Sequence, residues 1–148
     1  MIQDPGVRGN HDWPDAADDQ VQARREHEAR RLLLDRGADQ LTRRPWQQDP
    51  VPPSAIDLLH FVVWKSSAPA DETEQAGREL AVAGLRLLAA ARAELDQLET
   101  GLMFTARGLG LTWAEMARAL GLNSPQACQQ RLDRLTARTT HSAEDSKT

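Results

Sequence analysis

The sequence predicts an all-α protein, and three observations carry this prediction. Apolar residues recur at alternating spacings of three and four between residues 70 and 107, which is the pattern of a helix that packs along one face. Thr112 and Glu115 have the spacing of a capping box, which begins a helix. Gly121 and Pro125 are the residue types that end one helix and begin the next. We therefore expect a short helix and a long helix leading into a C-terminal helical hairpin, with a disordered N-terminal arm and a flexible C-terminal tail.

Residues 1–53 are expected to form a largely disordered arm, because prolines, glycines and acidic residues are frequent in it. Residues 16–37 are the exception: acidic residues come first, arginines follow, and Gly37 is placed to end a helix. The apolar residues of this segment are few and gather near its end, so we expect a fragile helix that forms against a partner. Trp13 and Trp46 are candidate anchors for a protein partner of the arm.

A stiff proline-containing linker leads to the part of the chain that we expect to be folded, residues 54–138. Ser54 is a favourable N-cap, and the apolar stretch that follows it matches both a short helix and a strand. We favour the short helix, because no other segment offers a strand for pairing.

Residues 70–107 are expected to form the long helix. Its acidic start and the arginine near its end suit the helix dipole. Its apolar positions form a heptad-like seam, namely Ala81, Gly84, Leu88, Ala91, Leu95, Leu98, Leu102 and Thr105. Such a helix either packs on its own domain or contributes part of the seam to a homodimer contact, and the spacing fits both interpretations.

The hairpin covers residues 112–136. A first helix, Trp113–Leu120, begins at the capping box, and Gly121 supplies the turn. A second helix, Pro125–Thr136, begins with a proline, whose missing N–H is harmless in the first turn. The residues expected to face inward are Trp113, Met116, Ala117 and Leu120 in the first helix, and Ala127 or Cys128, Leu132 and Leu135 in the second. Residues 139–148 are expected to form the flexible tail.

The second helix of the hairpin has an unusual polar face. A solvated helix usually mixes Glu and Lys in i,i+4 pairs, whereas this one has three Gln, two Arg and one Asp. Gln can bond adenine at N6 and N7, and Arg can bond guanine or a phosphate. The outward residues are Gln126, Gln129, Gln130, Arg131, Asp133 and Arg134. The hairpin length, the glycine turn and this face are typical of a helix-turn-helix, whose second helix enters the DNA major groove.

The charge distribution favours the same part of the chain as a nucleic-acid surface. The net charge of the whole chain is −4. Residues 1–100 carry a net charge of −6, residues 101–140 a net charge of +3 and residues 141–148 a net charge of −1. Because attraction to DNA depends on the face that a protein presents, the hairpin lies in the basic part that such a partner would meet.

Several other classes of function have no basis in the sequence. Cys128 is the only cysteine, and the four histidines have no ligand-spaced partners, so we expect no disulfide and no metal site. The chain has no Ser/His/Asp, Cys/His or glycine-rich phosphate motif, so we expect no enzyme activity and no cofactor. It has neither a signal peptide nor an apolar run long enough to span a bilayer, and we expect a cytoplasmic protein without a membrane partner.

The stretch GLTWAEMARALGLNSPQACQQRLDRL, residues 110–135, resembles the helix-turn-helix of small actinobacterial DNA-binding proteins. The resemblance extends upstream to about residue 85, and residues 1–53 do not share it. Met116 and Cys128 stand where these proteins usually have Ile and Ala, and Pro125 stands where Arg is frequent. In that family the second helix reads DNA, which implies this role for Ser124, Gln126, Gln129, Gln130, Arg131 and Arg134.

We therefore expect a protein that binds double-stranded DNA, as a transcriptional regulator or a nucleoid-associated protein. Gln126, Gln129 and Gln130 would face base edges, and the arginines expected on phosphates are Arg118, Arg131, Arg134 and Arg138. Since about four basic contacts bind DNA weakly, we also expect a homodimer through residues 70–107, or help from the N-terminal arm. The alternative is an adaptor that docks on RNA polymerase, a sigma factor or another regulator through the same helices, which the acidic excess of residues 45–100 supports.

Overall fold

The computed structural model describes residues 16–47, 51–67 and 73–145, with side chains from residue 17 to residue 140 within those ranges. Its helices are α1 (Ala16–Asp35), the short 3-10 helix η1 (Ala38–Gln40), α2 (Ala55–Ser67), α3 (Glu74–Gly108), α4 (Trp113–Ala119) and α5 (Pro125–Asp145). The described residues contain no β-strand, which confirms the all-α prediction. None of the helices in these ranges is long and apolar enough to cross a membrane.

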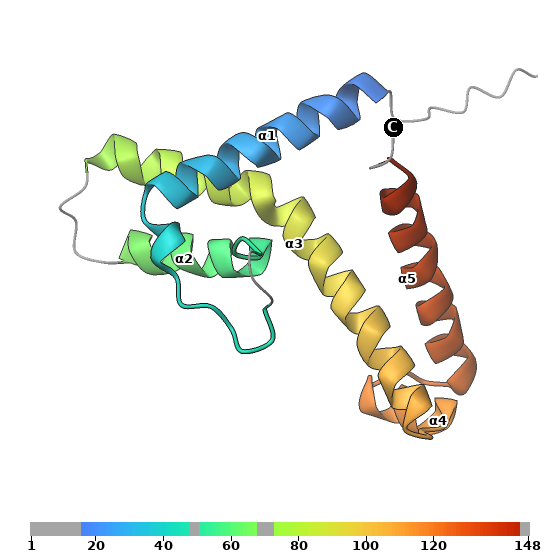
Figure 1. Ribbon diagram of the computed structural model, residues 1–148. Helices are drawn as coiled ribbons and strands as arrows, with labels where there is room; N and C mark the ends of the chain where they lie inside the picture. Colours follow the sequence, from blue (N-terminus) through green and yellow to red (C-terminus); the bar gives the residue numbers. More distant parts are fainter. Residues whose placement is uncertain (1–15, 48–50, 68–72, 146–148) are drawn as a thin grey trace, which may run out of the picture.

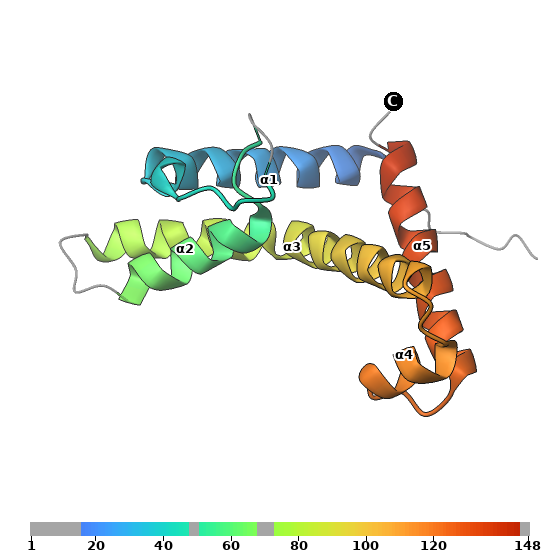
Figure 2. The same ribbon diagram turned by 60° about the horizontal axis from the view of Figure 1, so that its bottom comes forward.

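The 35-residue helix α3 is the axis of the molecule. Helices α1 and α2 pack along its N-terminal half, α5 packs along its C-terminal half, and α4 packs on α5 (Figure 1). The turned view shows the same division, with α4 and α5 gathered at the end of α3 that lies far from α2 (Figure 2). The helical hairpin therefore stands at one end of the molecule, away from the packing of α1 and α2.

A first hydrophobic core joins α1, η1, α2 and the N-terminal half of α3. Its buried members are Ala29, Leu33, Ala38, Leu58, Phe61, Val62, Leu80, Ala83 and Leu87. Helices α2 and α3 approach so closely that a Cβ added at Gly84 would lie 3.2 Å from Val62 Cγ1. The carboxylate of Glu94 on α3 accepts a hydrogen bond of 2.8 Å from the backbone N–H of Ala55, and so caps the first turn of α2 from outside.

The short helix after Ser54 is confirmed. The hydroxyl of Ser54 accepts a hydrogen bond of 3.0 Å from the backbone N–H of Asp57, as an N-cap does.

The helix expected at residues 16–37 is present as α1, while the division at residues 53 and 54 stays a prediction. Helix α1 packs on α3 and contributes Ala29 and Leu33 to the first core, and Arg36 pairs with Glu79 of α3 at 2.8 Å. The few apolar residues of α1 suffice because those near its end gather in the first core, where Ala29 and Leu33 are buried and Leu32 and Leu34 are partly buried. Residues 1–15, also expected to be disordered, lie outside the described residues.

The long helix is confirmed, but only part of the expected seam is buried. Gly84 and Ala91 are buried and Leu88 is half-buried, whereas the remaining seam positions, Ala81, Leu95, Leu98, Leu102 and Thr105, are exposed. The core of α3 uses Leu80, Ala83 and Leu87 instead, which lie one position away from seam residues. Upstream of Ala91, α1 and α2 cover the face of α3 that carries Leu80, Ala83 and Leu87. Downstream of Ala91, the leucines of the seam are exposed.

Helix α5 is longer than expected. It continues to Asp145, past the expected end at Thr136 and into the segment expected to be a flexible tail. Threonines are poor helix formers because their hydroxyls compete for the backbone. Here the hydroxyls of Thr136 and Thr139 donate to the carbonyl oxygens four residues earlier, each at 3.0 Å, so they are satisfied within the helix.

Candidate nucleic-acid interface

Helix α4 begins at the expected capping box. The Thr112 hydroxyl accepts a hydrogen bond of 3.2 Å from the backbone N–H of Glu115, and the Glu115 carboxylate accepts one of 2.7 Å from the backbone N–H of Thr112. The backbone and side-chain hydrogen bonds that Thr112 donates hold the pKa of Glu115 below its ordinary value. This box fixes the point at which the chain leaves α3 and enters the hairpin.

The turn between α4 and α5 uses the residues that the sequence indicates. Gly121 has φ +69, in the left-handed region that favours glycine, and the backbone N–H of Leu122 donates to the carbonyl of Ala117 at 2.8 Å. The hydroxyl of Ser124 accepts a hydrogen bond of 3.1 Å from the backbone N–H of Ala127, so Ser124 caps the helix that Pro125 begins. Ser124, expected among the DNA-contacting residues, is thus already used in the fold as a cap.

A second hydrophobic core holds α4 and α5 against the end of α3. Its buried members are Met103, Met116, Ala117, Cys128, Leu132 and Leu135, with Trp113 and Leu122 packed against them. Burial raises the pKa of the Cys128 thiol, so this residue stays a small protonated core side chain. Leu120, expected to be buried, is exposed, because it is the C-cap of α4 and lies at the start of the turn.

The outward face of α5 consists of Gln126, Gln129, Gln130, Asp133 and Arg134, and all five side chains are exposed. Spacings of three and four place them on the side of the helix opposite the second core. Within the described residues, the three glutamines and Arg134 make no hydrogen bond or ion pair with another side chain. Their donors and acceptors are therefore available to a partner. Arg118, on α4, is exposed as well.

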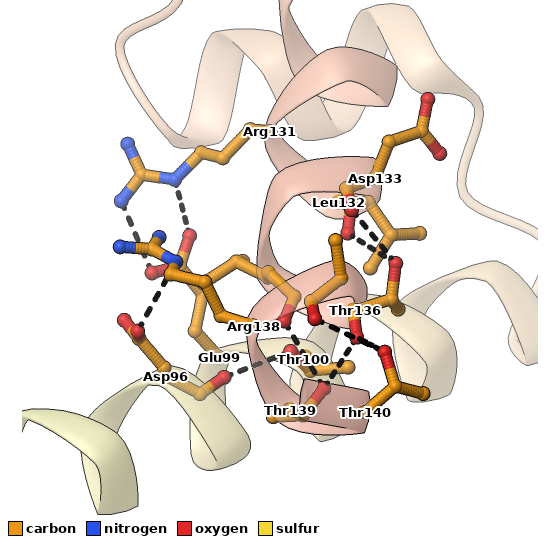
Figure 3. Close-up of polar contacts among 12 residues, drawn as sticks. Asp96, Glu99, Thr100, Arg131, Leu132, Asp133, Thr136, Arg138, Thr139 and Thr140 are labelled. Atoms are coloured by element: carbon orange, nitrogen blue, oxygen red, sulfur yellow. Dashed lines mark hydrogen bonds and ion pairs between the residues drawn. The ribbon is translucent and has the colours of Figure 1, made fainter. Parts of the chain in front are cut away.

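Arg131 does not lie on the outward face of α5 but on the side of the helix that faces α3. Its guanidinium points toward α3 and contacts both carboxylate oxygens of Glu99, with a distance of 3.1 Å from Nη2 to Oε2 and a very short contact from Nε to Oε1 (Figure 3). This two-point contact lowers the pKa of Glu99 and raises the pKa of Arg131. The pair joins α3 to α5 across 32 residues of sequence.

Arg138 repeats this arrangement two turns later on α5. Its Nε lies 3.5 Å from the Asp96 carboxylate, which is one turn before Glu99 on α3 (Figure 3). Two of the four arginines expected on phosphates are thus held in salt bridges. In the described part of the chain Arg118 and Arg134 form none, although Arg118 helps to lower the pKa of the Glu115 carboxyl through its charge. The pairing also lowers the local charge, because adding Asp96 and Glu99 to residues 101–140 reduces the net charge from +3 to +1.

Asp96 and Glu99 are the residues of the candidate interface that the sequence analysis does not single out. Their spacing of three on α3 and the spacing of seven between Arg131 and Arg138 on α5 place each pair on one helix face. This pattern could have indicated two facing stripes of opposite charge.

In the described residues no group of three His, Cys, Asp or Glu side chains could hold a metal ion. No protein-family model, curated protein or solved structure matches this chain, and the hairpin with its outward face is therefore the basis for a functional proposal.

Proposed function

We propose that this protein binds double-stranded DNA by inserting α5 into the major groove. The observation that carries the proposal is the outward face of α5, where three glutamines and Arg134 are exposed and have no side-chain partners in the described residues. A capped turn and a buried core hold this helix in place. Because the backbone of α5 is already ordered, binding has to order only the contacting side chains, at a cost of about 0.5–1.5 kcal/mol each.

The roles follow from the chemistry of the side chains. Gln126, Gln129 and Gln130 are suited to base edges, since an amide can donate to and accept from adenine at the same time. Arg134 and Arg118 are suited to phosphates on either side of the groove, because both are exposed and neither forms a salt bridge within the described residues. Arg131 and Arg138 orient α5 against α3 and contact DNA only if a phosphate replaces Asp96 or Glu99.

So few basic contacts give weak binding by one chain. A transcriptional regulator or a nucleoid-associated protein with this surface would act as a homodimer that places two α5 helices on one duplex, in the nucleoid of the cytoplasm. The salt dependence of binding separates phosphate contacts from base contacts and is the quantity to measure.

The test is a fluorescence anisotropy titration of a labelled duplex of about 20 base pairs, long enough for two half-sites one turn apart, at several salt concentrations. The variants are Arg118→Ala/Arg134→Ala for the phosphate contacts and Gln126→Ala/Gln130→Ala for the base contacts. Arg86→Ala is the matched control, since Arg86 is an exposed arginine on the N-terminal half of α3.

We expect wild-type binding to weaken steeply with salt. Arg118→Ala/Arg134→Ala should reduce the slope of log K against log salt by about 2, one for each lost phosphate contact. Gln126→Ala/Gln130→Ala should keep the slope and lose the preference between AT-rich and GC-rich duplexes. Arg86→Ala should bind as wild type does. Equal losses from Arg86→Ala and Arg118→Ala/Arg134→Ala would contradict a specific role for α5.

A second candidate function is an adaptor that docks on RNA polymerase, a sigma factor or another regulator. The observation that favours it lies in the turn between α3 and α4, where Leu109 and Leu111 are both exposed, Leu109 by 77 %. Exposed leucines beside a hairpin of low net charge suit a protein contact. An adaptor would show no binding to any duplex even at low salt, and Leu109→Ser would then impair capture of its protein partner while Arg134→Ala would not.

A further inference from the structure

A stripe of exposed leucines runs along the C-terminal half of α3. Leu95, Leu98 and Leu102 expose 57 %, 63 % and 69 % of their surface. Their spacings of three and four continue the face on which Leu87 and Ala91 are buried upstream. The cover that α1 and α2 give this face ends near Ala91, so among the described residues nothing buries the next three turns of it.

The stripe forms one wall of an apolar groove. The opposite wall comes from the segment before α2 and from its first turn, with Trp46 and Ile56, and the groove encloses about 770 Å³. Trp46 is 75 % exposed. The wall of α3 contains Gly101, where an added Cβ would meet no atom within 4 Å. Trp46, Leu98 and Leu102 thus surround a position at which another helix backbone can approach closely.

The charges that border the groove are neutralised within the chain. Arg44 pairs with Asp57 at 2.9 Å, and Glu94 pairs with Arg30 at 3.5 Å while it caps α2. The seam positions from Leu95 to Thr105 carry no charge at all. Two copies of this chain would therefore meet through this surface without bringing like charges together.

We propose that a second copy of this chain covers the groove, with the two α3 helices crossing near Gly101. The heptad-like spacing of the stripe requires a helix of matching spacing, and α3 of a second copy supplies it. Since α1 and α2 cover the same face upstream, the partner helix contacts only the part of α3 beyond Ala91. A standard interface buries about 800 Å² from each partner, and an aromatic side chain such as Trp46 alone supplies about 150–250 Å².

This inference deepens the proposed DNA binding, because it gives the complex two α5 helices, but its test needs no DNA. Sedimentation equilibrium of the full chain from about 1 to 100 µM spans the affinity of a modest interface. Leu98→Glu buries a carboxylate in the interface without disturbing the monomer, and Leu85→Glu is its matched control, since Leu85 is exposed by 67 % on another part of α3.

We expect a dimer for wild type and for Leu85→Glu, and an increase of about 100-fold in the dimer dissociation constant for Leu98→Glu, as a buried unpaired charge demands. Circular dichroism should be unchanged for both variants. In a Cys128→Ser background, Leu98→Cys should form an intermolecular disulfide under mild oxidation far faster than Leu85→Cys. A monomer at every concentration, or equal dimerisation of the two Glu variants, would overturn the proposal. Dimerisation without DNA binding would instead count against the proposed function alone.

Discussion

Arg131 illustrates how one side chain on a candidate reading helix can serve the fold. On sequence alone it belongs with Gln130 and Arg134 on a polar face. In the structure its guanidinium contacts Glu99 of α3 through Nε and Nη2. Its place on α5 explains the difference, since it lies between the second core and the outward face. The spacing of residues along α5 could be predicted, but the carboxylate that faces this flank comes from 32 residues away.

Glu99→Gln should therefore lower the stability of the fold in a pH-dependent way. The pKa of Glu99 is lowered from 4.5 in the folded state, so its pair with Arg131 stabilises the fold fully above about pH 4.5. That contribution is lost as the pH falls through the folded-state pKa. Because the Arg131 side chain is 41 % exposed, we expect a loss of only about 0.5–1 kcal/mol at pH 7.

Urea denaturation of wild type and Glu99→Gln at pH 7 and at pH 3 measures this difference. The gap between the two proteins should shrink at the lower pH. Glu28→Gln, at an exposed position of α1, is the control and should match wild type at pH 7. A gap of the same size at both pH values would show that the charge of Glu99 is not the cause.

Gly121→Ala should destabilise the hairpin by about 1–2 kcal/mol, because a side chain at φ +69 is strained. Gly108→Ala, at the last residue of α3, adds a Cβ in open space and should be neutral or slightly stabilising. Thermal unfolding of the two variants compares them directly, and an equal effect of both would contradict the role of the turn.

At the scale of elements, helix ends were easier to predict than helix lengths or partners. The capping box at Thr112, the turn at Gly121 and the proline that begins α5 are local signals, and each marks the boundary that it indicates. The end of α5 lies beyond the expected Thr136, because no local signal marks it and the threonine hydroxyls bond back to the helix itself. The packing of α1 was missed because it depends on a surface of α3 that no local pattern describes.

Leu33→Ala tests whether α1 belongs to the folded protein. Leu33 is fully buried in the first core, so its truncation should lower the free energy of unfolding by about 2–4 kcal/mol. Val21→Ala, at an exposed position of the same helix, should cost less than about 0.5 kcal/mol. Urea denaturation gives both free energies of unfolding. A negligible effect of Leu33→Ala would show that α1 is only loosely attached to the folded protein.

At the scale of the whole molecule, two separate hydrophobic cores lie along α3. One packs on its N-terminal half and the other on its C-terminal end. The first core holds α1 and α2 against one end of α3, and the second holds the hairpin at the other end. Composition and periodicity could predict the helices and the basic hairpin, but they could not tell which stretches of the apolar face of α3 are covered. That depends on where α1 and α2 end, and within the described residues it leaves the leucine stripe exposed.

The most direct test of the central claim, that the outward face of α5 contacts DNA, is a titration of the isotope-labelled protein with a duplex, followed by backbone amide chemical shifts. We expect the largest shifts at Gln126, Gln130 and Arg134 on α5 and smaller ones near Arg118 on α4, while the residues of the first core stay unchanged. Shifts confined to the leucine stripe or to Trp46, or no shifts at low salt, would contradict the claim and leave a protein partner as the better explanation of the hairpin.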